Sequence, residues 1–225
     1  MISVKHLNKT FTTGGAPMHA LSDVSLDIAD GAFVIITGRS GAGKSTLLYH
    51  MGLLDTPTSG EVEIDGIRAD AMSEKERTDF RLRRLGYVFQ SYALLPELTA
   101  LENVIVPLLM EGRAFEESRA MAYDALSRMD LEGKEENLPA QLSGGQQQRV
   151  AIARAIANNP SILFADEPTA NLDSETAARV MKAFRELHDA GQTILMVTHE
   201  LDLAPDASRI ITLSDGKVVS DERKK

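Results

Sequence analysis

A glycine-rich run between residues 38 and 46 has the composition of a phosphate-binding loop. It follows the apolar, β-branched stretch Phe33 to Thr37 and precedes an expected helix from Leu47 to Met51. A strand, a glycine turn and a helix N-terminus together bind anions, because backbone N–H groups and the helix dipole converge there. The loop residues are Gly38, Arg39, Ser40, Gly41, Ala42, Gly43, Lys44, Ser45 and Thr46.

These residues fit the pattern G-x-x-x-x-G-K-[ST]. In that pattern Lys44 binds the β- and γ-phosphates and the Ser45 hydroxyl binds Mg²⁺. The alternative is a chance glycine turn before a buried helix, and the flanking strand and helix count against it. We therefore expect the chain to bind a nucleoside triphosphate.

Two carboxylates close a second apolar stretch. Ile162 to Ala165 is a continuous apolar run of the kind found in parallel strands, and Asp166 and Glu167 follow it. In phosphate-loop enzymes such a strand ends in an acidic residue that orients Mg²⁺, which fits Asp166. Glu167 can act on the water that attacks the γ-phosphate, as a general base or by positioning it. The alternative is a strand that ends in a solvated acidic turn.

The string Leu142 to Gln146 predicts a second anion-binding helix end. Ser143 is placed to cap the helix, and Gly144 and Gly145 expose its first backbone N–H groups. A plain helix cap would explain Ser143 but not the paired glycines, which weaken a first helical turn. One nucleotide needs only one phosphate loop, so this second site has to serve another purpose.

The stretches between these motifs predict an α/β fold. Residues 2–7, 20–28 and 61–64 are expected strands with antiparallel hairpin signals, and 33–37, 86–89, 161–165, 193–197, 209–213 and 218–219 are further strands. Helices are expected at 73–84, where Ser73 and Glu76 form a capping box, and at 99–110, 116–129, 144–157 and 174–190. We expect Pro107 to kink or divide its helix. The predicted fold is a phosphate-loop NTPase core with a mainly parallel sheet, an antiparallel β subdomain and a helical insertion at about 91–158.

The amino-acid composition limits the classes of function that the chain can have. The chain has 225 residues, 43% of them hydrophobic and 25% charged, which is typical of one globular domain. It has no cysteine, which excludes disulfides and thiolate metal sites, and its formal net charge of −9 argues against nucleic acid as a partner. The first residues lack the apolar core of a signal peptide, and no apolar run approaches the roughly 20 residues of a membrane span. A membrane role would therefore come through a partner protein. Residues 221–225 are expected to be a solvated charged tail.

Over nearly its whole length the chain resembles the nucleotide-binding subunits of ATP-binding cassette (ABC) transporters, with the motifs in the family's order. Residues 38–46 match Walker A, Leu142 to Gln146 match the signature motif, and Asp166 and Glu167 match Walker B and its catalytic glutamate. The resemblance implies one ABC ATPase domain over residues 1–225, with ATP and Mg²⁺ bound.

Other positions match by resemblance as well. Gln90 corresponds to the Q-loop glutamine, Asn171 to Asp173 to the D-loop, and His199 to the switch histidine. Gln90 and His199 each follow a strand, at the sheet edge where ligands bind. There His199 can donate a hydrogen bond to the γ-phosphate, and the Gln90 amide can reach Mg²⁺ or the attacking water. A structural histidine and a loop glutamine bonded to backbone are the alternatives.

Phe11 falls where the family places an aromatic side chain that stacks on adenine. That residue is commonly tyrosine, so Phe11 keeps the aromatic face and loses the hydroxyl.

In the family two cassettes bind head to tail, so that the signature of one covers the ATP held by Walker A of the other. The resemblance therefore implies a second cassette subunit, in a homodimer. It also assigns Ser143, Gly144, Gly145, Gln146 and Asp173 to nucleotide contacts, and Ser45, Gln90 and Asp166 to Mg²⁺.

The stretch from Gln90 to Val104 lies where the family docks an integral membrane permease subunit, although its apolar residues could instead form the core of the helical insertion. The local sequence of this stretch, together with the segments Gly52 to Asp55 and Gln146 to Arg149, resembles one branch of the family. That branch includes macrolide-export, lipoprotein-release, haem-export, antimicrobial-peptide-resistance and cell-division cassettes. This implies an ATPase on the cytoplasmic face of the cell membrane that drives a separate membrane subunit. The alternatives are a soluble cassette ATPase acting on ribosomes, DNA or the cell-division machinery, and a phosphate-loop kinase or GTPase. A kinase or GTPase would have no use for the signature motif.

Overall fold

The computed structural model describes residues 2–12, 15–200 and 207–223 and contains two compact units. The first unit comprises Met1–Asp79 and Gly191–Lys225, and the second comprises Phe80–Ala190. The division falls within helix α2 (Glu74–Arg84).

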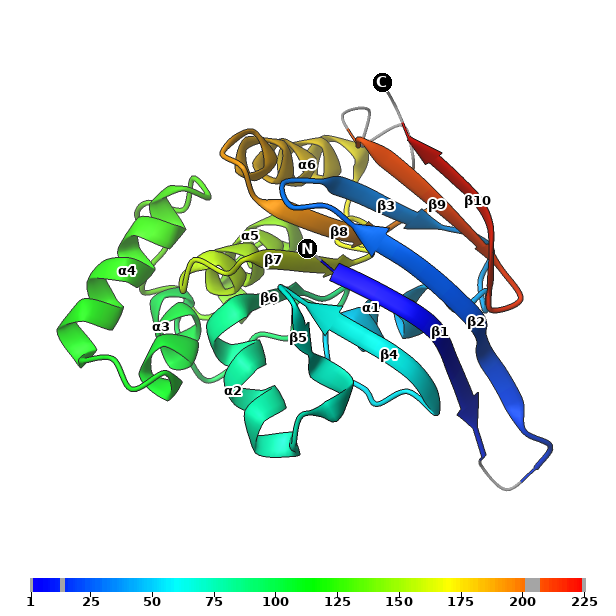
Figure 1. Cartoon of the computed structure of the whole chain (residues 1–225). Helices are drawn as coiled ribbons and strands as arrows, with labels where there is room; N and C mark the ends of the chain where they lie inside the picture. Colours follow the sequence, from blue (N-terminus) through cyan, green and yellow to red (C-terminus); the bar gives the residue numbers. More distant parts are fainter. Residues whose placement is uncertain (1, 13–14, 201–206, 224–225) are drawn as a thin grey trace. The chain divides into compact units, whose positions relative to one another are not determined.

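The first unit contains an antiparallel sheet, coloured blue to cyan in Figure 1. Its strands are β1 (Ile2–Phe11), β2 (Met18–Ile28), β4 (Ser59–Ile64) and β5 (Ile67–Arg68), in the order β2-β1-β4-β5. Buried Ile2, Val4 and Leu7 supply the core side of β1. The expected antiparallel part is confirmed, and β1 runs four residues further than its alternating pattern indicated, to Phe11.

The same unit holds the strand that leads into the phosphate loop. This strand, β3 (Phe33–Thr37), pairs in parallel with β8 (Thr193–Val197) and with β9 (Arg209–Ser214), and β10 (Lys217–Arg223) pairs antiparallel with β9. All of β8 and nearly all of β3 is buried, which explains why these strands are continuously apolar rather than alternating. Helix α1 (Lys44–Met51) follows β3.

The expectation of a solvated charged tail at residues 221–225 is right in part: residues 221–223 are exposed but lie in a strand, and residues 224–225 are outside the described residues. Residues 221–223 belong to β10, and both Asp221 carboxylate oxygens accept hydrogen bonds of 2.6 Å from Arg209. Arg209 is buried, so its guanidinium needs a carboxylate partner, and the strand provides one. Hydrogen bonds from Arg209 hold the pKa of Asp221 below its usual value despite partial burial.

The second unit contains a parallel strand pair and a group of helices, green to gold in Figure 1. Strands β6 (Leu85–Val88) and β7 (Ile162–Asp166) pair in register, with Leu85 opposite Ile162. The helices are α3 (Ala100–Met110), α4 (Phe115–Ser127), α5 (Gly144–Ile156) and α6 (Ser174–Asp189), with 3₁₀ turns at Ala69–Ala71 in the first unit and Pro139–Gln141 in the second. The predicted run of helices between two strands is confirmed.

Helix α3 is not divided at Pro107. It continues to Met110, and the N–H of Glu111 still donates to the Pro107 carbonyl at 3.1 Å. Only one turn follows the proline, and the N-terminal end is firmly anchored: the buried Asn103 amide donates to the carbonyls of Leu95, Leu98 and Thr99. The missing proline N–H removes one helical hydrogen bond, near the C-terminal end of α3.

Candidate nucleotide-binding site

At two of its positions the phosphate loop approaches neighbouring backbone too closely for any residue but glycine. Gly38 and Gly43 have φ angles of 142° and 96°, in the range that favours glycine. A Cβ atom would lie 2.2 Å from the Leu213 carbonyl oxygen at Gly38 and 2.4 Å from the Ala20 carbonyl oxygen at Gly43. The loop is thus held between β2 and β9, and the N–H of Gly216 adds a hydrogen bond of 3.1 Å to the Ala42 carbonyl.

Lys44 is the first residue of α1 and is largely buried within the loop. Its Nζ donates to the Arg39 carbonyl at 3.2 Å, and the N–H of Ala42 donates to the same oxygen at 3.1 Å. The helix N-cap is Gly43, which has no side chain to accept a bond from the first turn. A buried ammonium and a helix N-terminus without a capping side chain fit a phosphate.

His199 follows β8, next to the strand that leads into the loop. Ile36 of β3 is in register with Val197 of β8, and the N–H of Thr198 donates to the Ile36 carbonyl at 3.2 Å. The two strands are parallel, so His199 and the phosphate loop both follow the carboxyl edge of this sheet, the edge where ligands bind. The His199 side chain is exposed.

Phe11 is the last residue of β1 and lies opposite Met18 of β2. Its ring is partly exposed, and the Lys9 ammonium lies 4.9 Å from the ring centroid. With the loop and His199, Phe11 belongs to the first unit.

The remaining predicted residues belong to the second unit. Asp166 ends β7 and is buried, while Glu167 follows it with a φ angle of 45°. A left-handed conformation is uncommon for a residue with a side chain and is found most often where the surroundings impose it, as at functional sites. The backbone thus turns sharply between the two carboxylates.

The backbone around Gln90 is bonded to two other predicted elements. Gln90 is exposed just after β6, and its carbonyl accepts a hydrogen bond of 3.1 Å from the Asn171 side chain. The Arg154 guanidinium of α5 donates to the carbonyl of Tyr92 at 3.0 Å and to that of Ala93. The segment after β6 is therefore held to the 171–173 loop and to the helix that begins at the signature string.

Ser143 caps α5 as predicted. Its Oγ accepts from the N–H of Gln146 at 3.3 Å, and the Gln146 Oε1 accepts from the N–H of Ser143 at 2.9 Å. The glycine pair has a packing reason as well as an electrostatic one, because a Cβ at Gly145 would lie 2.0 Å from Thr176 Cγ2. The first turn of α5 therefore packs on the first turn of α6.

Asp173 is the N-cap of α6. Its carboxylate accepts from the N–H of Thr176 at 3.0 Å and from the Thr176 hydroxyl at 2.7 Å. These bonds hold the pKa of Asp173 below its usual value, so the cap is charged at neutral pH. The structure thus gives Asp173 a local role beside the nucleotide contact implied by the resemblance.

Sequence reasoning did not single out Gln148, on the core side of α5. Its side chain is fully buried, and neither Oε1 nor Nε2 has a hydrogen-bond partner. Only the run Gln146 to Gln148 hinted at it, since helical spacing puts Gln148 on the face of Gly145, inside the protein.

Gln148→Met should raise the free energy of unfolding by about 1–3 kcal/mol, because an unpaired buried amide is replaced by an apolar chain of similar length. Urea denaturation of the nucleotide-free protein measures this. The control Gln147→Met removes a hydrogen bond of 3.1 Å to the Leu142 carbonyl and should not stabilise. A Gln148→Met protein less stable than wild type would show that the amide is paired in solution.

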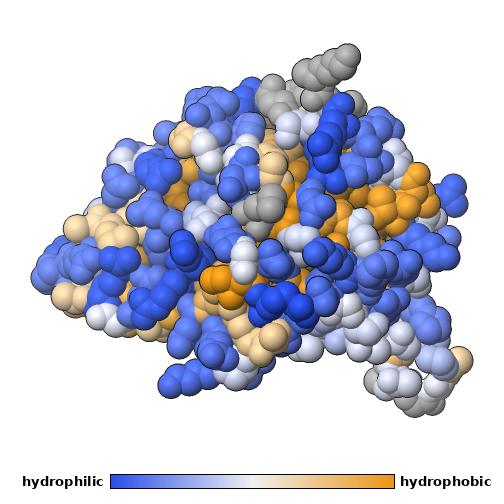
Figure 2. Space-filling view, in the orientation of Figure 1, coloured by the Kyte–Doolittle hydropathy of each residue, from blue (hydrophilic) through white to orange (hydrophobic). Residues whose placement is uncertain are grey.

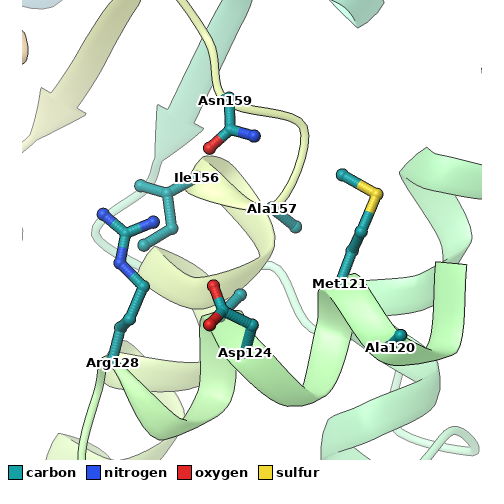
Figure 3. Close-up of a pocket in the computed structure, with 8 residues that line it drawn as sticks. Ala120, Met121, Asp124, Arg128, Ile156, Ala157 and Asn159 are labelled. Atoms are coloured by element: carbon teal, nitrogen blue, oxygen red, sulfur yellow. The ribbon is translucent and has the colours of Figure 1, made fainter. Parts of the chain in front are cut away.

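A pocket of about 270 Å³ lies between α4 and the end of α5, lined by Ala120, Met121, Asp124, Ala125, Arg128, Ile156, Ala157 and Asn159 (Figure 3). It contains none of the residues predicted to bind nucleotide. The candidate site is therefore defined by the motifs and not by this hollow.

Mg²⁺ fits the donor chemistry of the predicted residues. Ser45, Gln90 and Asp166 offer oxygen ligands, and Mg²⁺ keeps most of its coordination for water and phosphate. In the part of the chain that the structure describes, no group of three or more His, Asp or Glu side chains could hold a metal alone.

Hydrophilic side chains cover most of the face shown in Figure 2, with apolar ones between them. Across the described residues, none of the helices combines the length and the apolar character that crossing a membrane requires.

Comparisons with protein families, with curated proteins and with solved structures agree with one another. A family model described as "ABC transporter" matches residues 21–170. The lipoprotein-releasing system ATP-binding protein LolD of Aquifex aeolicus is 52% identical over 201 residues, which is 89% of this chain and 90% of LolD. The macrolide export ATP-binding/permease protein MacB of Mannheimia succiniciproducens is 45% identical over 224 residues. The chain spans only 35% of the length of that MacB relative.

A solved structure of the ATP-binding cassette MJ0796, described as dimeric, in a post-hydrolysis state and bound to ADP and Pi, matches with a TM-score of 0.93 and 45% identity. The match covers 100% of this chain and 99% of that one. The predicted fold class is confirmed.

Proposed function

Since the chain belongs to the ABC transporter family, we propose that it binds and hydrolyses ATP and thereby drives a separate membrane subunit. The observation that carries this proposal is the pairing of Lys44, buried within its loop, with the first turn of α1, whose cap is a glycine. An ammonium and a helix N-terminus directed at the same place are suited to the terminal phosphates of a nucleotide.

The second anion-binding end supports a dimer. Helix α5 begins with Gly144 and Gly145, and one nucleotide has no need of a second such terminus. Two chains placed head to tail would each contribute a phosphate loop to one ATP and a signature end to the other. The MJ0796 cassette is described as dimeric, which supports a dimer, and the proposed head-to-tail arrangement would be symmetric, with the same contact made twice.

The proposed chemistry is a water attack on the γ-phosphate, which breaks the bond from the γ-phosphorus to the bridging oxygen and releases ADP and phosphate. Lys44 would bind the β- and γ-phosphates, and His199 would donate a hydrogen bond to the γ-phosphate. Glu167 would accept the proton of the attacking water or orient it. Ser45, Asp166 and Gln90 would hold Mg²⁺, which when bound neutralises phosphate charge. Loss of the γ-phosphate contacts would then release the dimer, as a ligand-driven shift in population.

The membrane partner is proposed to dock along the stretch from Gln90 to Val104. Leu95 in this stretch exposes 46% of its surface, although it is large and apolar. Arg154 of α5 binds the carbonyls of Tyr92 and Ala93, and Asn171 binds the carbonyl of Gln90. A force that the partner applies to this stretch would therefore reach α5, the helix that begins at the signature string, directly. The names of the LolD and MacB relatives support export or another task outside the cytoplasm, with this chain on the cytoplasmic face of the cell membrane.

Co-purification from detergent-solubilised membranes tests this proposal. A multi-helix membrane protein should be recovered with the tagged chain, and Leu95→Asp should lower its recovery by about 10-fold, because a buried unpaired charge is costly. The matched control is Met110→Asp, an exposed apolar residue at the end of α3 outside this stretch. Recovery of ribosomes or DNA instead would favour the soluble cassette ATPase.

A further inference from the structure

Lys9 lies at the centre of a set of contacts in the first unit that no sequence motif indicated. Its Nζ lies 2.9 Å and 2.8 Å from the two carboxylate oxygens of Asp55 and donates to the Thr56 carbonyl at 2.8 Å. The same ammonium lies 4.9 Å from the centroid of the Phe11 ring. Only 13% of the Lys9 side chain is exposed, although 38% of the Asp55 side chain is, so the ammonium is partly desolvated.

The Asp55 end of this set lies beside the phosphate-loop helix, next to a histidine that makes no hydrogen bond to it. His50, in the last turn of α1, is buried; its Nδ1 donates to the Thr46 carbonyl at 2.7 Å, and its Nε2 lies 3.8 Å from Asp55 Oδ2. Burial lowers the pKa of His50, which keeps the imidazole neutral. Burial alone would raise the pKa of Asp55, but the hydrogen bonds from Lys9 and Thr56 outweigh it, so the pKa is lowered and Asp55 is charged.

The segment after α1 is held from a second side by α2. Arg77 donates from Nη1 to the Thr56 hydroxyl at 2.6 Å and from Nη2 to the Leu53 carbonyl at 3.1 Å. The N–H of Leu54 also donates to the Tyr49 carbonyl of α1 at 2.8 Å, so the segment that carries the Lys9 acceptors is tied to both helices. Lys9 in turn fixes the end of β1, where Phe11 lies.

We propose that Lys9 is a positioning residue for the nucleotide base. Held by Asp55, its ammonium fixes the Phe11 ring by a cation–π contact and so links the base site to the phosphate-loop helix. The inference rests on the proposed function, in which Phe11 stacks on adenine. A phenyl ring has two faces, so an ammonium over one face leaves the other as the stacking surface for a base.

The competing role for Lys9 is a plain structural tie between β1 and the segment after α1. Loss of a structural tie would weaken the binding of phosphates at the phosphate loop and the binding of the base at its site to a similar extent. A positioning role is selective, because it affects only ligands that carry a base. A ligand without a base separates the two roles.

Calorimetric titration with Mg–ATP and with Mg–tripolyphosphate provides this separation. Lys9→Met keeps the apolar stem and removes the charge. It should weaken ATP binding by about 10-fold, the size of a partly desolvated cation–π contact, and leave tripolyphosphate binding within about twofold of wild type. Lys9→Arg keeps a cation over the ring and should bind ATP nearly as wild type does. Lys5→Met, on the same strand, is the matched control and should change neither affinity.

A double-mutant cycle with Phe11→Ala completes the test. If Lys9 acts through the ring, Lys9→Met should cost little more in ATP affinity once Phe11 is absent. Additive losses, or equal weakening of ATP and tripolyphosphate, would overturn the positioning role. A wild-type chain that binds no ATP, or a Phe11→Ala variant with unchanged ATP affinity, would instead overturn the base site in the proposed function.

Discussion

Lys44→Ala should abolish ATP binding and dimer closure together. The ammonium is buried inside the loop and donates to the Arg39 carbonyl, so it is in place before any phosphate arrives. Losing a buried charged donor costs about 3 kcal/mol or more, which corresponds to an affinity about 100-fold weaker. Calorimetry with Mg–ATP and size-exclusion chromatography with and without ATP measure the two effects.

A folding defect has to be separated from a binding defect in this variant. Lys44→Met keeps the buried apolar stem and should show the same loss with a melting temperature near that of wild type. Lys182→Ala, an exposed lysine of α6 paired with Glu186, is the control and should bind ATP normally. A Lys44→Ala protein that still dimerises with ATP would contradict the proposal that each phosphate loop is half of a shared site.

Glu167→Gln should bind ATP and accumulate as an ATP-dependent dimer. The amide has nearly the shape of the carboxylate but cannot accept the proton of the attacking water, so turnover should fall by about 100- to 10,000-fold. The closed dimer would then persist because its γ-phosphate contacts are not removed. Phosphate release and size-exclusion chromatography in Mg–ATP give the two readings.

The position of Glu167 makes this variant informative. The residue has a φ angle of 45° directly after β7, a conformation that glutamine tolerates as glutamate does, so the fold should not change. Glu186→Gln, on the exposed face of α6, is the matched control and should leave both readings unaltered. Rapid turnover by Glu167→Gln with no dimer would reject the role given to Glu167.

Local sequence signals predicted much of this architecture. The apolar runs at β3, β7 and β8 identified buried strands, and Ser143 with Gln146 identified the start of α5, because each signal is set by near neighbours. The same holds for the capping box of Ser73 and Glu76, where the serine N–H donates to the carboxylate at 2.8 Å.

Features set by distant partners could not be predicted in this way. Asp221 was expected to lie in a tail, because its partner, Arg209, lies on the preceding strand across a turn. The sequence does not show that Arg209 is buried and needs a carboxylate. Gly145 looked like a backbone donor, and its packing on Thr176 depends on where α6 lies. The contact of Lys9 with Asp55 joins residues 46 positions apart, so no local pattern signals it.

The bonds around Gln90 have a consequence for how such a chain could be redesigned. Asn171 and Arg154 both bind main-chain oxygens, at Gln90, Tyr92 and Ala93, and main-chain oxygens are present whatever the side chains are. In the proposed docking arrangement, substitutions at positions 91–99 would therefore change which partner is recognised while these main-chain bonds stay intact. Specificity for the partner would then depend on side chains, and force transmission on main-chain oxygens. Exchanging a short surface segment would let the same ATPase drive a different membrane partner.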